Sequence, residues 1–351
     1  MTRPKTTCLE IARIAGVSVG TVSRVVNNRP GVSAERTERV RKAIAETGYR
    51  PSQAAGILAG KRTYSIGLLL PCPVLERYGS MSYGTASTFS GILAALDQTP
   101  FQLSTSTAVK DKLLDEKDLL ATPMLRQLSL EGLLLDLPHF IADPEKALEG
   151  LSLPYVLVNP RLYKASNSVL VDDEGVASTA VEHLAAKGHR RIAYIGPNML
   201  APPHYSVPAR KEGYLQAMAR AGLDPVIRDD SPTDDPAIMQ LSAWECIERM
   251  VSTKRCTAIM GYDAAWTSEI MKVCYELGLR VPADVSVVSC DWEPSLDLTV
   301  VPVASIFIDR VEMGRQAAQM LIRRIENHGI SLPAHVVSYS WIENQSVREL
   351  K

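Results

Sequence analysis

Side chains that could read the edges of nucleic-acid bases gather in a short segment near the N-terminus. A helical pattern that begins after Ser18 turns Val22, Val25 and Val26 inward and leaves a second set of residues on the outer face. An arginine on such a face can donate to O6 and N7 of guanine together, and small apolar residues can pack on a thymine methyl or permit close approach. The outer set consists of Val19, Gly20, Ser23, Arg24 and Asn27.

Three short helical patterns within residues 1–50 position this segment. Gly16 ends the first helix, because glycine accepts the left-handed conformation of a tight turn, and Ser18 is a good N-cap for the second. Ser33 caps a third helix, which Gly48 ends. The short turn between the first two helices predicts a helix-turn-helix whose second helix fits the DNA major groove. The alternative is a three-helix protein-interaction module, in which Arg24 is a solvated surface residue.

The charge distribution favours a polyanion as the partner of this head. The 351-residue chain has a net charge of −1, but residues 1–62 carry 12 Lys and Arg against 4 Asp and Glu. The remaining residues carry 26 against 35. Because neutralisation of phosphates dominates DNA affinity, a basic head on an acidic body favours DNA binding over the protein-interaction module.

From residue 64 onward, short apolar runs alternate with amphipathic stretches, which predicts right-handed β-α-β units in a doubly wound parallel sheet. The length of this part favours two such lobes over one. The fold class is therefore α/β with an all-α head. The strands are expected at residues 65–70, 132–137, 155–158, 191–195, 257–260 and 285–289.

Several classes of protein are excluded by what the sequence lacks. No apolar run has the length and composition of a membrane span or of a signal peptide, and the six cysteines are scattered without a C-x-x-C pair. We therefore expect a cytoplasmic protein with reduced thiols. Phosphate-loop, dinucleotide, nucleophile-elbow and H-E-x-x-H motifs are missing, and the histidines do not cluster. No catalytic residue, metal or cofactor is predicted.

The head resembles the LacI/GalR family of bacterial repressors. The resemblance is carried in register by LEIA (9–12), AGVS (15–18), TVSRVVN (21–27), VS (32–33) and GYRP (48–51). It implies that Val19, Gly20 and Arg24 read bases, and that Thr21, Asn27 and Ser33 meet phosphate or orient the helix. In this family a short hinge helix pairs with its copy in the minor groove, where a leucine wedges a base step. Ala55 and Leu58 occupy the matching hinge positions.

The body extends the resemblance, through DD (172–173), KGHRRIA (187–193), RKEGY (210–214), LGLRVPADVSVV (277–288) and EMG (312–314). It implies a periplasmic-binding-protein-like fold, with two lobes joined by three crossovers and a small ligand between them. We expect the helix-turn-helix at 1–50, the hinge at 51–63 and the two-lobed domain at 64–343. The first lobe would hold residues 64–160 and 292–326, and the second 161–291 and 327–343.

Ligand-binding residues are implied by the resemblance alone. Arg210, Tyr262, Asp263 and Asp291 should line the cleft, where an arginine and a carboxylate suit a polyhydroxylated ligand. Relatives usually carry Asn-Asp at positions 262–263 and an aspartate at 292, so this chain departs from the pattern. Tyr262 and Trp292 could stack on a sugar ring or a base, or could pack within the protein.

These observations predict a homodimeric transcriptional regulator, acting as a repressor on near-palindromic operator DNA and controlled by a sugar or a sugar derivative. The same fold could respond to a nucleoside or purine effector. A solute receptor of a transport system shares the body fold, but the basic head opposes it. An enzyme acting on sugars lacks its acid, base and metal motifs. The sequence leaves the effector, the operator and the direction of control open.

Overall fold

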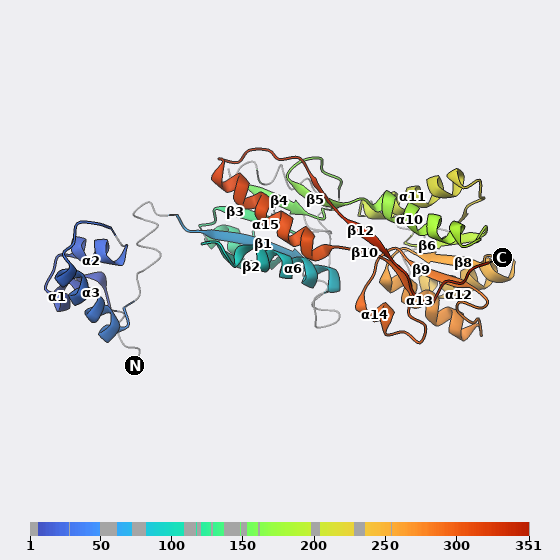
Figure 1. Cartoon of the computed structure of the whole chain (residues 1–351), viewed down its shortest axis with the longest axis horizontal. Helices are drawn as coiled ribbons and strands as arrows, with labels where there is room; N and C mark the ends of the chain where they lie inside the picture. Colours follow the sequence, from blue (N-terminus) through green and yellow to red (C-terminus); the bar gives the residue numbers. More distant parts are fainter. Residues whose placement is uncertain are drawn as a thin grey trace. The chain divides into compact units, whose positions relative to one another are not determined.

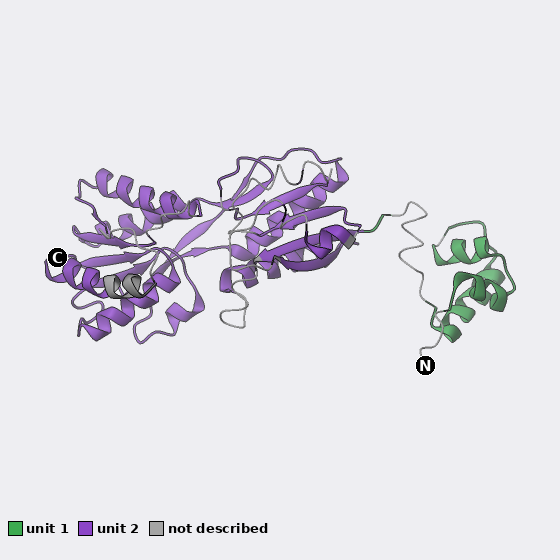
Figure 2. Ribbon diagram, turned by 180° about the vertical axis from the view of Figure 1, so that it is seen from behind, with its two compact units in different colours: residues 1–63 green, residues 64–351 purple. Residues whose placement is uncertain are grey.

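The computed structural model describes residues 6–27, 29–49, 62–71, 82–108, 117, 121–127, 129–136, 148, 153–160, 162–197, 204–227, 236–253 and 255–350. The chain forms two compact units, a head of residues 1–63 and a body of residues 64–351 (Figure 2). The expected hinge residues Ala55 and Leu58 lie outside the described residues.

The head is a three-helix unit, as expected. It contains α1 (Cys8–Ala15), α2 (Val19–Val26) and α3 (Ala34–Thr47). Gly16 ends α1 in the left-handed conformation at φ +63°, which an L side chain rarely adopts. The three helices pack on one small apolar core, formed by Ile11, Ala12, Ala15, Val22, Val25, Val40 and Ala43.

The body contains two six-stranded sheets (Figure 1). The first has the order β11-β5-β4-β3-β1-β2, and all its neighbouring strands run parallel. Its strands are β1 (Ser65–Pro71), β2 (Gln102–Ala108), β3 (Gly132–Leu135), β4 (Tyr155–Val158), β5 (Ser168–Val171) and β11 (His335–Val337). Its helices are α6 (Tyr83–Leu96), α8 (Pro123–Gln127) and α15 (Arg310–Glu326).

The second sheet has the order β12-β10-β9-β8-β6-β7, in which only β12 runs antiparallel to its neighbour among the described strands. Its strands are β6 (Ile192–Ile195), β7 (Val226–Ile227), β8 (Ala258–Gly261), β9 (Ser286–Ser289), β10 (Ala304–Ile308) and β12 (Tyr339–Ile342). Its helices are α10 (Asp173–Ala186), α11 (Ser206–Arg220), α12 (Pro236–Ser252), α13 (Ala264–Glu276) and α14 (Pro294–Asp297).

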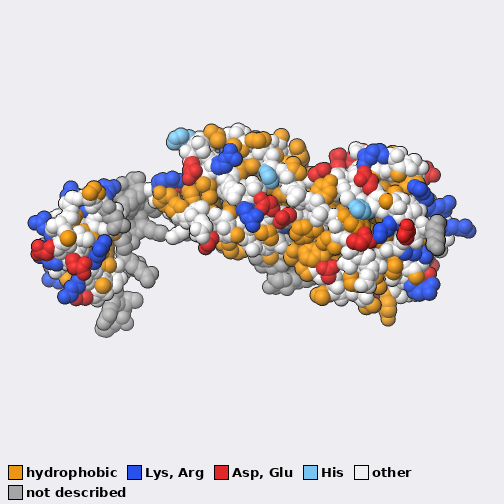
Figure 3. Space-filling model, viewed as in Figure 1, with side chains coloured by type: hydrophobic (Ala, Val, Ile, Leu, Met, Phe, Trp, Pro, Cys, Tyr) orange, Lys and Arg blue, Asp and Glu red, His pale blue; other side chains and the backbone are white. Residues whose placement is uncertain are grey.

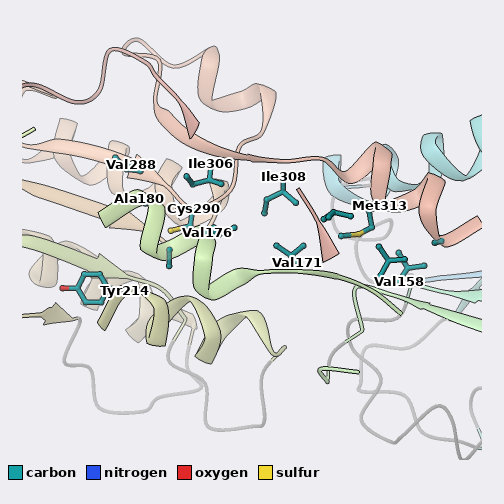
Figure 4. Close-up of a cluster of buried hydrophobic side chains, with 14 of the residues drawn as sticks. Val158, Val171, Val176, Ala180, Tyr214, Val288, Cys290, Ile306, Ile308 and Met313 are labelled. Atoms are coloured by element: carbon teal, nitrogen blue, oxygen red, sulfur yellow. The ribbon is translucent and has the colours of Figure 1, made fainter. Parts of the chain in front are cut away.

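The chain passes between the sheets at three places. It leaves β5 for α10 through Asp172, β10 for α15 through Asp309, and β11 for β12 through Ser338. Asp172 and Asp309 accept hydrogen bonds from Gly175 N and Glu312 N, so each of these two crossovers also caps the helix that follows it. One buried cluster runs through the crossovers, from Val158 and Met313 in the first lobe to Tyr214 in the second (Figure 4).

The expected two-lobed architecture is present, but the expected lobe boundaries need correction. The resemblance places residues 161–291 in the second lobe and 292–326 in the first. However, β5 pairs with β4 in the first sheet, and β10 pairs with β9 in the second. β11, expected in the second lobe, pairs with β5 in the first. The reason is that each crossover follows its strand, whereas all three expected boundaries precede that strand.

Among the residues that the structure describes, no helix is both long enough and apolar enough to span a membrane.

Candidate functional site

The outer face of α2 is solvent-exposed. Val22 and Val25 are buried against α1 and α3, whereas Val19, Gly20, Ser23 and Arg24 are exposed. A hollow beside the turn before α2 is lined by residues that include Val19, Thr21 and Arg36. Helix periodicity alone therefore located this face correctly, because a three-helix core leaves α2 only one side for its inward residues.

Three of the predicted DNA-binding residues hold the helices in place. Ser18 Oγ accepts a hydrogen bond from Thr21 N (3.1 Å) and also lies 3.0 Å from Thr21 Oγ1, so Ser18 is the N-cap of α2. Asn27 Nδ2 donates to Ser23 O at 2.6 Å at the other end of the helix. Ser33 Oγ accepts from Arg36 N at 3.4 Å and caps α3. These three residues thus hold helix ends in place. For Asn27 and Ser33, orienting a helix is one of the two roles that the resemblance implies.

Charged side chains of both signs lie on the face of the head drawn in Figure 3. The described Lys and Arg residues, apart from Arg62 at its boundary with the body, are Arg13, Arg24, Arg29, Arg36, Arg39, Arg41 and Lys42. Lys42 has an acidic neighbour, Glu46, at 4.0 Å, and both side chains are largely exposed. Exposed cations of this kind are the groups that neutralise phosphates.

The second candidate site lies where the two lobes meet, and it is built on close helix contacts. In the second lobe, a Cβ on Gly213 of α11 would lie 2.1 Å from Glu174 O of α10. Because glycine permits this approach, Arg210, one turn earlier on α11, reaches Asp173 at the start of α10. In the first lobe, Gly314 of α15 approaches Thr88 O of α6 in the same way, which brings Arg310 over Gly84.

Arg210 is the centre of a buried ion network. Its Nε donates to Asp173 Oδ1 at 2.6 Å, its Nη1 donates to Tyr262 O at 2.5 Å, and its Nη2 lies 3.8 Å from Asp291 Oδ2. The Arg210 and Asp173 side chains are 5% and 1% exposed. Burial alone would lower the pKa of Arg210, but the charge of Asp173 raises it well above its usual value. Arg210 is therefore a structural cation as well as a candidate ligand contact.

The remaining predicted ligand residues also have partners within the protein. Asp263 accepts from Trp266 N at 2.9 Å and caps α13. The Tyr262 ring lies under the Arg210 guanidinium at 4.7 Å, and its hydroxyl is 2.6 Å from Ser206 Oγ. Trp292 contacts the rings of Tyr83 and Phe307 edge to face and donates from Nε1 to Asp297 Oδ2. These contacts favour packing roles for Tyr262 and Trp292, and ligand binding by either stays a prediction.

Sequence reasoning missed three charged groups at the lobe junction, namely Asp173, Arg310 and Asp136. Arg310 joins the lobes through Asp291, and Asp136 follows β3 at the same edge of the first sheet. One signal could have revealed Arg310. A cation at the first position of a helix is disfavoured by the helix dipole, and such local inconsistencies mark functional or strained sites.

Within the described residues, no group of three or more His, Cys, Asp or Glu could hold a metal ion.

A helix-turn-helix head joined to a two-lobed, doubly wound body is the architecture of one class of protein, the ligand-controlled regulators. Residues 7–52 match the family model of the bacterial regulatory proteins of the lacI family, and residues 181–347 match a periplasmic binding protein-like domain. The chain is 30% identical over 334 residues to the HTH-type transcriptional regulator CelR of Thermobifida fusca, covering 92% of this chain and 93% of that protein. It is 29% identical to the regulator AscG of Escherichia coli over 93% of this chain and 94% of that one.

Solved structures share the fold of this chain. A lac repressor dimer bound to operator and the anti-inducer ONPF superposes with a TM-score of 0.79 at 23% identity, over 98% of this chain and all of that one. A complex of the regulator CelR with cellobiose gives 0.64 at 25% identity, over the same shares of the two chains. The chain belongs to the lacI family of bacterial regulatory proteins. Its relatives are transcriptional regulators rather than enzymes, which confirms both the expected family and the expected class.

Proposed function

We propose that this chain is a homodimeric repressor that binds a near-palindromic operator and is controlled by a sugar or a sugar derivative held between its lobes. The observation that carries the proposal is the exposed outer face of α2, with Arg24 at its centre, on a well-packed three-helix head. Arg24 would donate to a guanine in each half-site, and Val19 and Gly20 would contact neighbouring bases. The hinge at 51–63 would place Leu58 in the minor groove.

A second copy of the chain is part of this proposal. Leu298 and Val300, just after α14, are 86% and 102% exposed. Apolar side chains with so much of their surface in water suit a protein–protein interface. Two bodies that pair would present two heads to the two halves of one operator. The lac repressor in the structure compared above is likewise a dimer bound to operator.

The sugar effector is supported by the polar groups at the lobe junction. Arg210 Nη2 makes no hydrogen bond within the described residues and could donate to a ligand hydroxyl, while Asp291 could accept one. Both residues belong to the second lobe, and Tyr83 of the first lobe contacts Trp292 of the second edge to face. The CelR structure carries cellobiose.

Coupling between effector and operator tests the control that we propose. Sugars and nucleosides would be screened by their effect on thermal unfolding of the full chain, and each stabilising compound would then enter fluorescence anisotropy titrations with operator DNA. We expect one sugar to change operator affinity by about 5–150-fold, and operator to change sugar affinity by the same factor. A sugar that stabilises the body without changing operator affinity would contradict the proposed control. If only nucleosides raise the unfolding temperature of the chain, the effector belongs to the alternative class, the nucleosides and purines.

Gly20 provides a separate test of the DNA-reading face. A methyl group at Gly20 would come no closer than 3.8 Å to Ser18 Oγ, so the head has room for it. Alanine favours a helix over glycine by about 1 kcal/mol, so Gly20→Ala is expected to unfold at the same temperature as wild type or higher. Its operator affinity should nevertheless fall, by about 1–3 kcal/mol, because the methyl group meets the bases. Unchanged affinity would show that α2 does not approach the bases at Gly20.

A further inference from the structure

Arg310 connects the two lobes through a single carboxylate. It is the first residue of α15 in the first lobe, and its Nη1 and Nη2 donate to Oδ1 and Oδ2 of Asp291 in the second lobe at 2.8 and 2.6 Å. The two side chains are 15% and 11% exposed. A Cβ on Gly84 would lie 2.8 Å from Arg310 Nε, so any larger residue there would force the Arg310 side chain to shift from its present path to Asp291.

Arg310 also has a second carboxyl group close by, on its own lobe. Asp136 follows β3 and donates its backbone N–H to Leu69 O at 3.0 Å. The residue is only 8% exposed, and its side chain makes no hydrogen bond or ion pair with any residue in the described part of the chain. Burial weakens the hydration of this carboxyl group, and the Arg310 charge already acts on it, so Asp136 would gain from a guanidinium brought closer.

We propose that Arg310 is a two-position latch, which pairs with Asp291 when the lobes lie as in this structure and with Asp136 when they separate. The inference rests on the proposed function, since a ligand that uses Asp291 must take this carboxylate from Arg310. The released guanidinium then finds the unpartnered Asp136 instead of being left buried and unpaired. Other charged groups that act on the latch are Arg210, Asp173, Asp263 and Glu293.

The partner exchange links lobe opening to a proton. Burial raises the pKa of Asp136 to about 7, against a smaller opposing effect of Arg310. Closer approach of the guanidinium would lower this pKa further, so the proton of Asp136 passes to solvent as Arg310 arrives. Raising the pH through about 7 therefore favours the open position, and lowering it favours the pair with Asp291.

Hydrogen exchange of the full chain, without DNA or effector, tests the latch. After correction for the intrinsic pH dependence of exchange, residues 82–92 and 289–297 should lose protection in the wild type between pH 6 and pH 8. In Arg310→Met we expect these two segments to exchange about tenfold faster or more at pH 6 and at pH 8, because the cross-lobe pair is gone.

In Asp136→Asn the same segments should stay protected at both pH values, since the neutral amide does not attract the Arg310 guanidinium. Gly84→Ala, which retains every charge but obstructs the side chain, should also exchange faster.

The matched control is Arg315→Met, which removes another arginine of α15, one that pairs with Glu312 on the surface. It should exchange as the wild type does. Wild-type exchange in both Arg310→Met and Gly84→Ala would overturn the latch, and so would an Asp136→Asn variant that keeps the wild-type pH response. Neither result would bear on the proposed function, because hydrogen exchange is measured here without operator and without effector.

Discussion

Arg210→Met is expected to lower the free energy of unfolding of the body by about 3–5 kcal/mol, since removal of one partner leaves a buried charge unpaired. The carboxylate left without its partner is that of Asp173, whose side chain is 1% exposed and whose Oδ1 lies 2.6 Å from Arg210 Nε. Tyr262 would also lose the cation over its ring and the donor to its carbonyl oxygen. Urea unfolding followed by circular dichroism measures the loss.

Arg220→Met is the matched control for this prediction. Arg220 lies on the same helix and pairs with Glu182 at 3.2 Å, but the two side chains are 55% and 62% exposed. Exposed pairs contribute about 0–1 kcal/mol, so the control should unfold nearly as the wild type does. If Arg210→Met lowers the free energy of unfolding no more than Arg220→Met does, the Arg210 pair is not structural. Arg210 would then be a ligand contact only.

The second large effect is expected at Arg24. Arg24→Ala should lower discrimination at one symmetric pair of guanines by about 1–3 kcal/mol per contact, while binding to unrelated DNA stays mostly intact. The reason is that the other basic residues of the head still neutralise phosphates. Anisotropy titrations with operator and with a scrambled duplex at one salt concentration give the ratio. A variant that keeps the wild-type ratio would contradict the assignment of α2 as the recognition helix.

The head could be predicted from its sequence because its information is local. Gly16 and Ser18 mark the turn, and apolar residues spaced three and four apart within the helices form the core. These signals depend on the geometry of one turn of chain and need no knowledge of the rest of the molecule. The exposed face of α2 then follows from which side the core uses.

The lobe junction could be predicted only in part, because its contacts join residues far apart in the sequence. The resemblance placed Arg210 and Asp291 together in the second lobe, and the structure agrees. It gave no partner for Arg210, since Asp173 lies 37 residues away and meets it only through the contact of Gly213 with α10. The sheet to which β5 or β10 belongs is likewise a matter of long-range pairing, which apolar runs do not reveal.

The most direct test of DNA recognition by α2 is selection of DNA by the full chain from a pool of random duplexes, followed by sequencing of the bound fraction. A lacI-family regulator whose paired heads read bases through α2 should enrich one near-palindromic motif, with a guanine at symmetric positions that Arg24→Ala ceases to select. Bound duplexes with no common motif, or a motif that is the same for Arg24→Ala and wild type, would contradict sequence-specific recognition by this helix.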